Sequence, residues 1–195
     1  FKQEYEADFN TYEGQIWNFN FETQVQDLAN FDTSKMDVFA GLDVGFRDPT
    51  AMCVIAYDWD TEKFYLLDEY FNNERTTDQH AEQIQKLIDR WAIDYIYIDS
   101  AAQQTRFDFA QNYGISTINA KKSIIDGIGH VASIIDNDKL YIDQDAKQSL
   151  TCVDAYQWDP NPNLLKEKPK HNMASHMSDA IRYALYSFIV SNVTF

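Results

Sequence analysis

The stretch from Val38 to Asp58 constrains the fold more than any other part of this chain. It predicts two β-strands, residues 38–44 and 50–58, rich in β-branched and aromatic residues and joined by a Gly-x-x-Asp-Pro turn. Asp43 is the single charged residue inside the first of these strands. A buried carboxylate is costly unless it is paired or binds a cation, so Asp43 needs a partner. Asp43 either accepts hydrogen bonds at the strand end or belongs to a cation-binding site.

Two glycines, Gly41 and Gly45, lie two residues before and two residues after Asp43. Side chains two residues apart in a strand point to the same face, so both glycines leave space on the face that Asp43 occupies. We expect a bulky group to approach there, such as a hydrated cation together with a phosphodiester.

The rest of the chain alternates strands and helices. Strands are predicted at residues 64–70, 93–99, 115–120 and 140–143, and helices at 76–92, 103–113, 124–137 and 146–157, before a last helix capped by Ser175. Three antiparallel strands followed by helical crossovers predict an α/β fold with a mixed sheet of five or slightly more strands and helices on both faces. In such a sheet the ends of the first and fourth strands can be neighbours, which would bring Asp43 to Asp99. The last helix can add Asp179.

Three carboxylates within about 4–5 Å of one another repel strongly unless divalent cations lie between them. Hard oxygen ligands without a cysteine or paired-histidine cluster select Mg²⁺ or Mn²⁺. Two such ions about 3.5–4 Å apart suit phosphodiester hydrolysis. We therefore expect Asp43 to bridge two ions and Asp99 and Asp179 each to complete the ligand shell of one. The alternative for Asp179 is an acid that is present only because the helix dipole stabilises negative charge near the N-terminus.

Three motifs in this order resemble a known family. They are Gly-Leu-Asp-Val-Gly-x-x-Asp-Pro-Thr-Ala at 41–51, Tyr-Ile-Asp-Ser-Ala at 97–101 and His-Met-Ser-Asp-Ala-Ile-Arg-Tyr-Ala at 176–184. They are similar to the nuclease domain of the large terminase subunit of tailed bacteriophages, which has an RNase H-like fold. The resemblance covers residues 38–190. It implies that Asp43, Asp99 and Asp179 bind metal and that His176 assists catalysis or orients a ligand; capping or pairing with an acid is the alternative for His176.

The resemblance also implies a substrate and partners. The substrate would be concatemeric double-stranded DNA, cut in the host cytoplasm during genome packaging, with an upstream packaging ATPase domain, a portal and a small terminase subunit as partners. No glycine precedes a lysine in this sequence, so the phosphate-binding loop of such an ATPase does not occur in it. We expect residues 1–37 to be an arm or linker from an ATPase domain that is absent here, and residues 38–195 to form the nuclease domain.

A net charge of −15 opposes contact with phosphates, which lysine and arginine normally drive. The positions of the lysines therefore matter. Lys121 and Lys122 follow the fifth strand at the edge where Asp43 and Asp99 end, and three more precede the last helix in a proline-rich loop: Lys166, Lys168 and Lys170. We expect these side chains to contact the DNA backbone, with solvated surface lysines as the alternative. Asp48 is expected to be a residue of the Asp-Pro turn, with contact to a metal through water as the alternative.

Other interpretations of the same residues remain open. The first is a junction-resolving or transposase-type nuclease with the same fold. The second is a catalytically weak DNA-binding module in which the acids only chelate or repel. An actin-like kinase would need two such domains and more chain. No apolar run approaches the roughly 20 residues that span a bilayer, so we expect no membrane contact. Cys53 and Cys152 are expected to be buried thiols.

Overall fold

A seven-stranded mixed sheet forms the centre of the protein. The structure, a computed structural model, describes residues 14–45, 47–161 and 167–192. The strand order is β1-β7-β4-β3-β2-β5-β6. The strands are β1 (Val25–Gln26), β2 (Asp37–Asp43), β3 (Thr50–Asp58), β4 (Lys63–Asn72), β5 (Tyr95–Ile98), β6 (Ile118–Asn119) and β7 (Leu140–Asp143).

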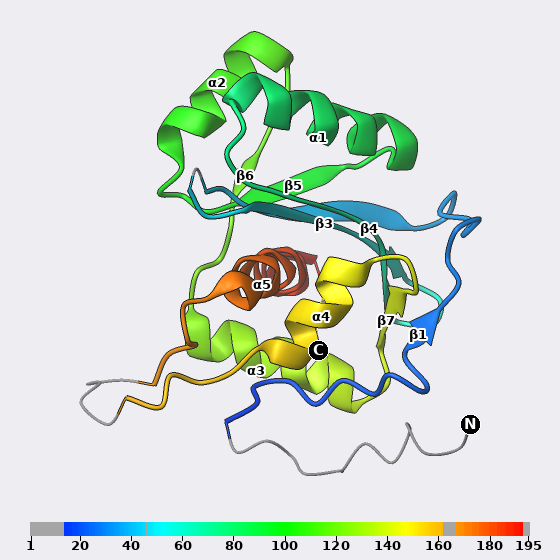
Figure 1. Cartoon of the computed structure of the whole chain (residues 1–195). Coiled ribbons are helices and arrows are strands. Elements are labelled where there is room, and N and C mark those ends of the chain that lie inside the picture. Colours follow the sequence, from blue (N-terminus) through cyan, green and yellow to red (C-terminus); the bar gives the residue numbers. More distant parts are fainter. Residues whose placement is uncertain (1–13, 46, 162–166, 193–195) are drawn as a thin grey trace, which may run out of the picture.

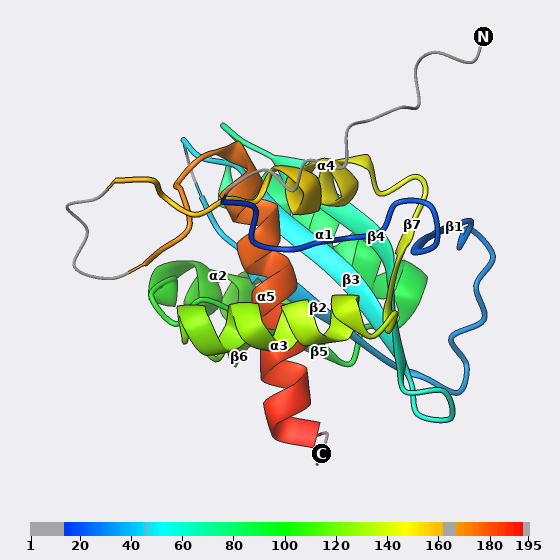
Figure 2. The same ribbon diagram turned by 90° about the horizontal axis from the view of Figure 1, so that it is seen from below.

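Helices cover both faces of this sheet, as the sequence predicts (Figure 1). They are α1 (Thr77–Trp91), α2 (Gln103–Tyr113), α3 (Ile124–Asp136), α4 (Lys147–Ala155) and α5 (Met173–Asn192). Helices α1 and α2 lie on one face, and α3, α4 and α5 lie on the other. Figure 2 shows α3 crossing α5, which contacts β2 and β3 directly.

The alternation of side chains along β2 divides the core into two layers. Phe39 points toward α5, where its ring stacks on Phe188 with ring centroids 4.1 Å apart. Ala40 and Leu42 belong to the opposite layer, with the buried residues of α1. Because side chains in a strand alternate, Gly41 and Asp43 share the face of Phe39, toward α5.

The strand order puts the two predicted acidic strand ends side by side. Strands β2, β3 and β4 form the predicted antiparallel meander, and β5 pairs with β2 in parallel. The central strand β2 therefore has β3 on one side and β5 on the other. Both neighbours keep it away from the sheet edge, which confirms the prediction of a buried strand.

Three local features were not predicted from the sequence. The described part of the expected arm, residues 14–37, packs on the domain itself: Trp17 is fully buried and β1 pairs with β7. Strand β6 is shorter than the predicted 115–120. Helix α5 begins at Met173 because Asn172, rather than Ser175, caps it: the Ser175 amide donates to Asn172 Oδ1 at 3.2 Å.

No helix in the described part of the chain has both the length and the apolar character needed to span a membrane. Cys53 and Cys152 are buried, free thiols, as predicted.

Candidate functional site

Asp43 and Asp99 lie at the ends of two adjacent parallel strands. Leu42 of β2 is the register partner of Ile98 of β5, and each acid is the residue that follows. The two chains therefore present a carboxylate at the same edge of the sheet. The side chains are 17% and 25% exposed, so both reach solvent from a largely buried position.

Helix α5 brings Asp179 toward this edge by lying directly on β2. A Cβ atom at Gly41 would lie 1.8 Å from the backbone oxygen of Ala180, so the helix fills the space above this glycine. At Gly45 a Cβ atom would lie 2.4 Å from the backbone oxygen of Asp48, inside the turn after β2. The expectation that both glycines make room for a ligand is therefore wrong, because protein backbone occupies the space at each.

Each of the three acids has a basic partner. Asp43 Oδ2 lies 2.9 Å from His176 Nδ1, and Asp99 Oδ1 lies 2.6 Å from Lys122 Nζ. Asp179 Oδ1 lies 3.0 Å from a terminal nitrogen of Arg182 and also accepts a hydrogen bond of 3.4 Å from the Tyr156 hydroxyl. The negative charge expected at this sheet edge is present, and protein side chains balance it.

The electrostatics of the three acids differ. Burial raises the pKa of Asp179, Arg182 opposes this rise, and the nearby charge of Asp43 adds to it. Burial also acts to raise the pKa of Asp99, but hydrogen bonds from the Ala101 amide and from Lys122 outweigh it, and the pKa lies below its ordinary value. These two carboxylates therefore differ in how readily they release a proton.

His176, one helical turn before Asp179, contacts Asp43. Its hydrogen bond to Asp43 raises its pKa, burial opposes the rise, and the charges of Asp43, Asp48 and Asp179 add to it. Three carboxylates thus act on one imidazole, which indicates an excess of negative charge around it. Such an environment favours a bound cation.

A group of possible metal ligands adjoins this histidine. Within the described ranges, Asp48, His171 and His176 are the group of three whose ligand atoms all lie within 4.8 Å of one another. Among the described residues, Asp43, Asp99 and Asp179 do not form such a group. Asp48 was expected as a turn residue, with contact to a metal through water as the alternative, and no metal contact was expected of His171. The position of His171 five residues before His176, where the chain enters α5, is the sequence signal that could have indicated it.

The lysines divide into three kinds. Lys122 enters the site through Asp99, whereas the exposed Lys121 is tied to α5 through its backbone amide, 2.8 Å from Ser187 Oγ. Lys168 and Lys170 are exposed on a segment that pairs with residues 157–159 through backbone hydrogen bonds and leads into α5. Lys166 lies outside the described residues.

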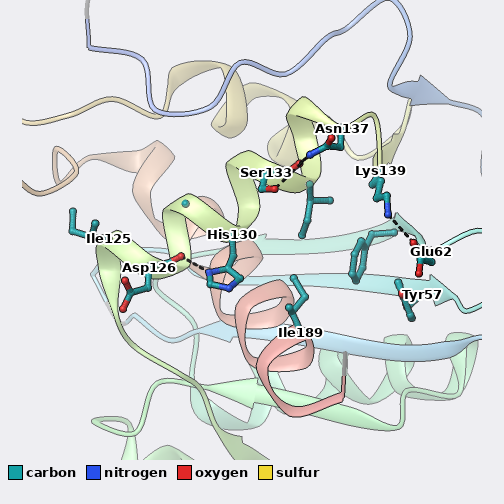
Figure 3. Close-up of a pocket in the computed structure, with 12 residues that line it drawn as sticks. Tyr57, Glu62, Ile125, Asp126, His130, Ser133, Asn137, Lys139 and Ile189 are labelled. Carbon is teal, nitrogen blue, oxygen red and sulfur yellow. Dashed lines mark hydrogen bonds and ion pairs between the residues drawn. The ribbon is translucent and has the colours of Figure 1, made fainter. Parts of the chain in front are cut away.

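One sizeable cavity is remote from these acids. It has a volume of about 680 Å³ and lies between α3, the end of α5 and the β3–β4 turn (Figure 3). Tyr57, which lines it, pairs with Asp37 at the start of β2. Asp43 ends the same strand six residues later, about 20 Å away. The cavity therefore does not belong to the acidic site.

Comparison with known proteins agrees with this arrangement. Residues 40–188 match the family described as the terminase RNaseH-like domain. The large terminase subunit of Escherichia phage T5 is 41% identical over 196 residues, covering 96% of this chain and 45% of that protein. The chain therefore spans less than half the length of that relative.

Solved structures share the fold. The large terminase from the thermophilic bacteriophage D6E has a TM-score of 0.78 at 21% identity, covering 91% of this chain and 45% of that one. The large terminase nuclease domain from bacteriophage SPP1 with bound Mn has a TM-score of 0.65 at 21% identity, covering 89% and 99%. The predicted α/β fold with RNase H-like topology is confirmed. By its family match and its identity to the T5 protein, this chain belongs to the RNase H-like nuclease-domain family of terminase large subunits.

Proposed function

We propose that this domain is a metal-dependent endonuclease that cuts concatemeric double-stranded DNA during phage genome packaging, by hydrolysis with two metal ions. The observation that carries the proposal is the meeting of Asp43 and Asp99 at adjacent strand ends under the helix that carries Asp179. Membership of the terminase family supports the substrate class.

The donor set fits Mg²⁺ or Mn²⁺. The three acids supply hard carboxylate oxygens, which these ions prefer. The basic partners mark places where positive charge is already stabilised. Lys122 is 46% exposed on a flexible stem, so it can turn away from Asp99 when a cation takes its place. The structure of the SPP1 nuclease domain contains bound Mn, which supports the use of a divalent ion.

Asp43, Asp99 and Asp179 would hold the ions. Bound divalent ions would supply an activated water and stabilise the charge on the leaving oxygen. The protein supplies the orientation. Asp43 fixes the His176 ring through Nδ1, and Nε2, which lies 3.9 Å from Asp48 Oδ1, can hold or release a proton near the site.

Arg182 orients Asp179 and joins it to the segment that carries Lys122. One of its terminal nitrogens contacts Asp179, and the other donates to the backbone oxygens of Lys122 and Ser123 at 3.3 and 3.4 Å. The side chain is 3% exposed. A buried arginine that binds both segments keeps the third acid and the lysine in register across the site.

Lysines around the site would contact the DNA backbone. Lys122 adjoins Asp99, and the proposed contacts on its neighbour and on the segment before α5 are Lys121, Lys166, Lys168 and Lys170. Such contacts bind without reading sequence. The upstream ATPase domain, the portal and the small terminase subunit are the proposed partners, in the cytoplasm of the host. With them, the acidic domain would not have to hold DNA by its own charge.

The test is incubation of supercoiled plasmid with the purified chain in Mg²⁺, Mn²⁺ or EDTA. We expect nicking and linearisation with metal, no cutting in EDTA, and 5′-phosphate and 3′-hydroxyl ends. Asp43→Ala, Asp99→Ala and Asp179→Ala should each abolish cutting while circular dichroism remains native. Cutting of branched DNA alone would favour a junction-resolving enzyme. Metal-independent DNA binding without cutting would favour a binding module.

A further inference from the structure

Asp48, His171 and His176 come from three segments and meet beside the acids. Asp48 lies in the turn after β2, His171 precedes α5, and His176 lies in the first turns of that helix. The two oxygens of Asp48 face one imidazole each: Oδ2 lies 3.7 Å from His171 Nε2, and Oδ1 lies 3.9 Å from His176 Nε2. The two imidazole rings are 5.2 Å apart between centroids. One carboxylate and two imidazoles thus converge on one point.

His176 is already oriented as a metal-binding histidine. Its Nδ1 lies 2.9 Å from Asp43 Oδ2, and an ionised carboxylate can only accept a hydrogen bond. Nδ1 therefore carries the hydrogen, and the lone pair of the neutral ring is on Nε2, the atom that faces Asp48. A carboxylate bound to the remote nitrogen is the arrangement that fixes histidine ligands in metal sites. The ring is 10% exposed, so its neighbours hold it in place.

The spacing between Asp48 and each of the two imidazoles suits a small ion. Two ligands about 2.0–2.1 Å from a tetrahedral Zn²⁺ lie roughly 3.3 Å from each other. The distances of 3.7 and 3.9 Å exceed this by about half an ångström. Asp48 and His171 have side chains that are 58% and 74% exposed, so both can make this small movement. A fourth position would remain for water.

The donor set differs from that of the neighbouring acids. Imidazole nitrogens suit Zn²⁺, Cu²⁺, Ni²⁺ and Co²⁺, whereas Mg²⁺ is bound by oxygen and keeps much of its water. Mn²⁺ is the weakest of the divalent first-row ions in such nitrogen-containing sites. The site with two imidazoles would therefore favour Zn²⁺ and similar ions, and the adjoining carboxylates would favour Mg²⁺ or Mn²⁺.

We propose that Asp48, His171 and His176 form a transition-metal site that takes Zn²⁺ in preference to Mg²⁺ and inhibits DNA cleavage when it is filled. The inhibition rests on the proposed nuclease function. A bound Zn²⁺ would occupy His176 Nε2 and place an additional positive charge beside Asp43. Asp43, with Asp99 and Asp179, would hold the catalytic ions. The binding itself does not depend on cleavage.

The binding is tested with Co²⁺ as a visible probe and with Zn²⁺ in calorimetry, on the intact 195-residue chain. We expect one Co²⁺ absorption band that Zn²⁺ displaces and a large excess of Mg²⁺ does not. His171→Ala should weaken Zn²⁺ binding at least tenfold, and Asp43→Asn by about 10–100-fold through loss of the hydrogen bond to His176. The matched control is His130→Ala, on α3, where the imidazole contacts the backbone oxygen of Asp126 and the ring of Tyr186. Equal binding by His171→Ala and His130→Ala, or no Co²⁺ band, would overturn the proposal.

The inhibition is tested by titrating Zn²⁺ into plasmid cleavage driven by Mn²⁺. The wild type should lose activity as the site fills, and His171→Ala should need at least tenfold more Zn²⁺ while cutting normally without it. Identical inhibition curves for the two proteins would overturn the inhibitory role. A wild type that never cuts would refute the nuclease instead, and the Co²⁺ result would still decide the site.

Discussion

The backbone oxygen of Ala180 occupies the position where a side chain at Gly41 would begin, 1.8 Å from a Cβ atom built there. The helix that carries Asp179 therefore rests on the backbone of the strand that ends in Asp43. This contact sets the distance between the third acid and the first, because neither element can shift without losing it. A glycine near the site thus serves the approach of a helix.

Replacing Gly41 should separate α5 from β2. We expect Gly41→Ala to destabilise the fold by about 1–3 kcal/mol or more, because the new methyl group must displace backbone. Metal binding should weaken as well, since Asp179 would move away from Asp43. Thermal unfolding and calorimetry with Mn²⁺ measure the two effects. The control is Gly129→Ala on α3, where nothing lies within 4 Å and stability should rise by up to about 1 kcal/mol. Equal melting temperatures of the two variants would contradict the contact.

Lys122 should compete with the metal ion for Asp99. Removing its charge by Lys122→Ala should tighten Mn²⁺ binding in the absence of DNA by roughly tenfold, because the ammonium group would no longer need to be displaced. The effect on stability should stay below about 1 kcal/mol, since the pair is partly exposed. Lys121→Ala removes the adjacent positive charge without touching this pair and serves as the control in calorimetry. Unchanged affinity in Lys122→Ala would show that the lysine does not block the site.

The pair of His176 and Asp43 should make stability depend on pH. The hydrogen bond to Asp43 raises the pKa of His176 above its usual value near 6.5. A raised pKa stabilises the fold fully below the usual value, and the contribution is lost as pH rises through the raised pKa. We expect His176→Gln to cost roughly 1.5–3 kcal/mol at about pH 6 and clearly less at about pH 9.

Denaturant unfolding across this pH range measures the effect. In an Asp43→Asn background the same histidine substitution should show a much flatter pH dependence, because the partner that raises the pKa is gone. A cost that stays constant with pH in the wild-type background would mean that the pair does not change its protonation on folding.

The two cysteines should be inert in the native protein. Burial raises the pKa of Cys53 to about 12 and that of Cys152 to about 12. Because the thiolate is the reactive form, a thiol reagent at about pH 8 should label the folded chain far more slowly than the chain in guanidinium chloride. Rapid labelling of either cysteine without denaturant would show that the core opens readily on the face that α5 covers.

Local sequence patterns were sufficient for much of this fold. Helix α2 and strand β7 have the predicted bounds, and Gly114 ends α2 with a φ of 66°, as a left-handed cap requires. Strand β1 could not be predicted, because two residues show no period and the strand exists only through its pairing with β7. The cap of α5 was assigned to Ser175 because Asn172 and Ser175 carry the same signal three residues apart.

Part of the candidate site could likewise be predicted from the sequence, and part could not. Asp43 and Asp99 could be foreseen. Each is a charged residue at the end of an apolar strand, and the order of strands and helical crossovers allows these two strands to be neighbours. The contact between Asp48 and His171 could not, because it depends on where the turn after β2 and the segment before α5 meet in space. Lys122 was expected to contact DNA, and its contact with Asp99 adds a role that strand order alone does not reveal.

Nicking of supercoiled plasmid by Asp43→Asn tests the central claim most directly. The matched control is Asp37→Asn, which removes a carboxylate from the opposite end of the same strand, where Asp37 accepts a hydrogen bond from Trp59. With Mn²⁺ present, the wild type and Asp37→Asn should cut at similar rates, EDTA should stop both, and Asp43→Asn should lose about a hundredfold or more. Cutting by folded Asp43→Asn at the wild-type rate, or cutting that EDTA does not affect, would contradict a metal-dependent nuclease built on these acids.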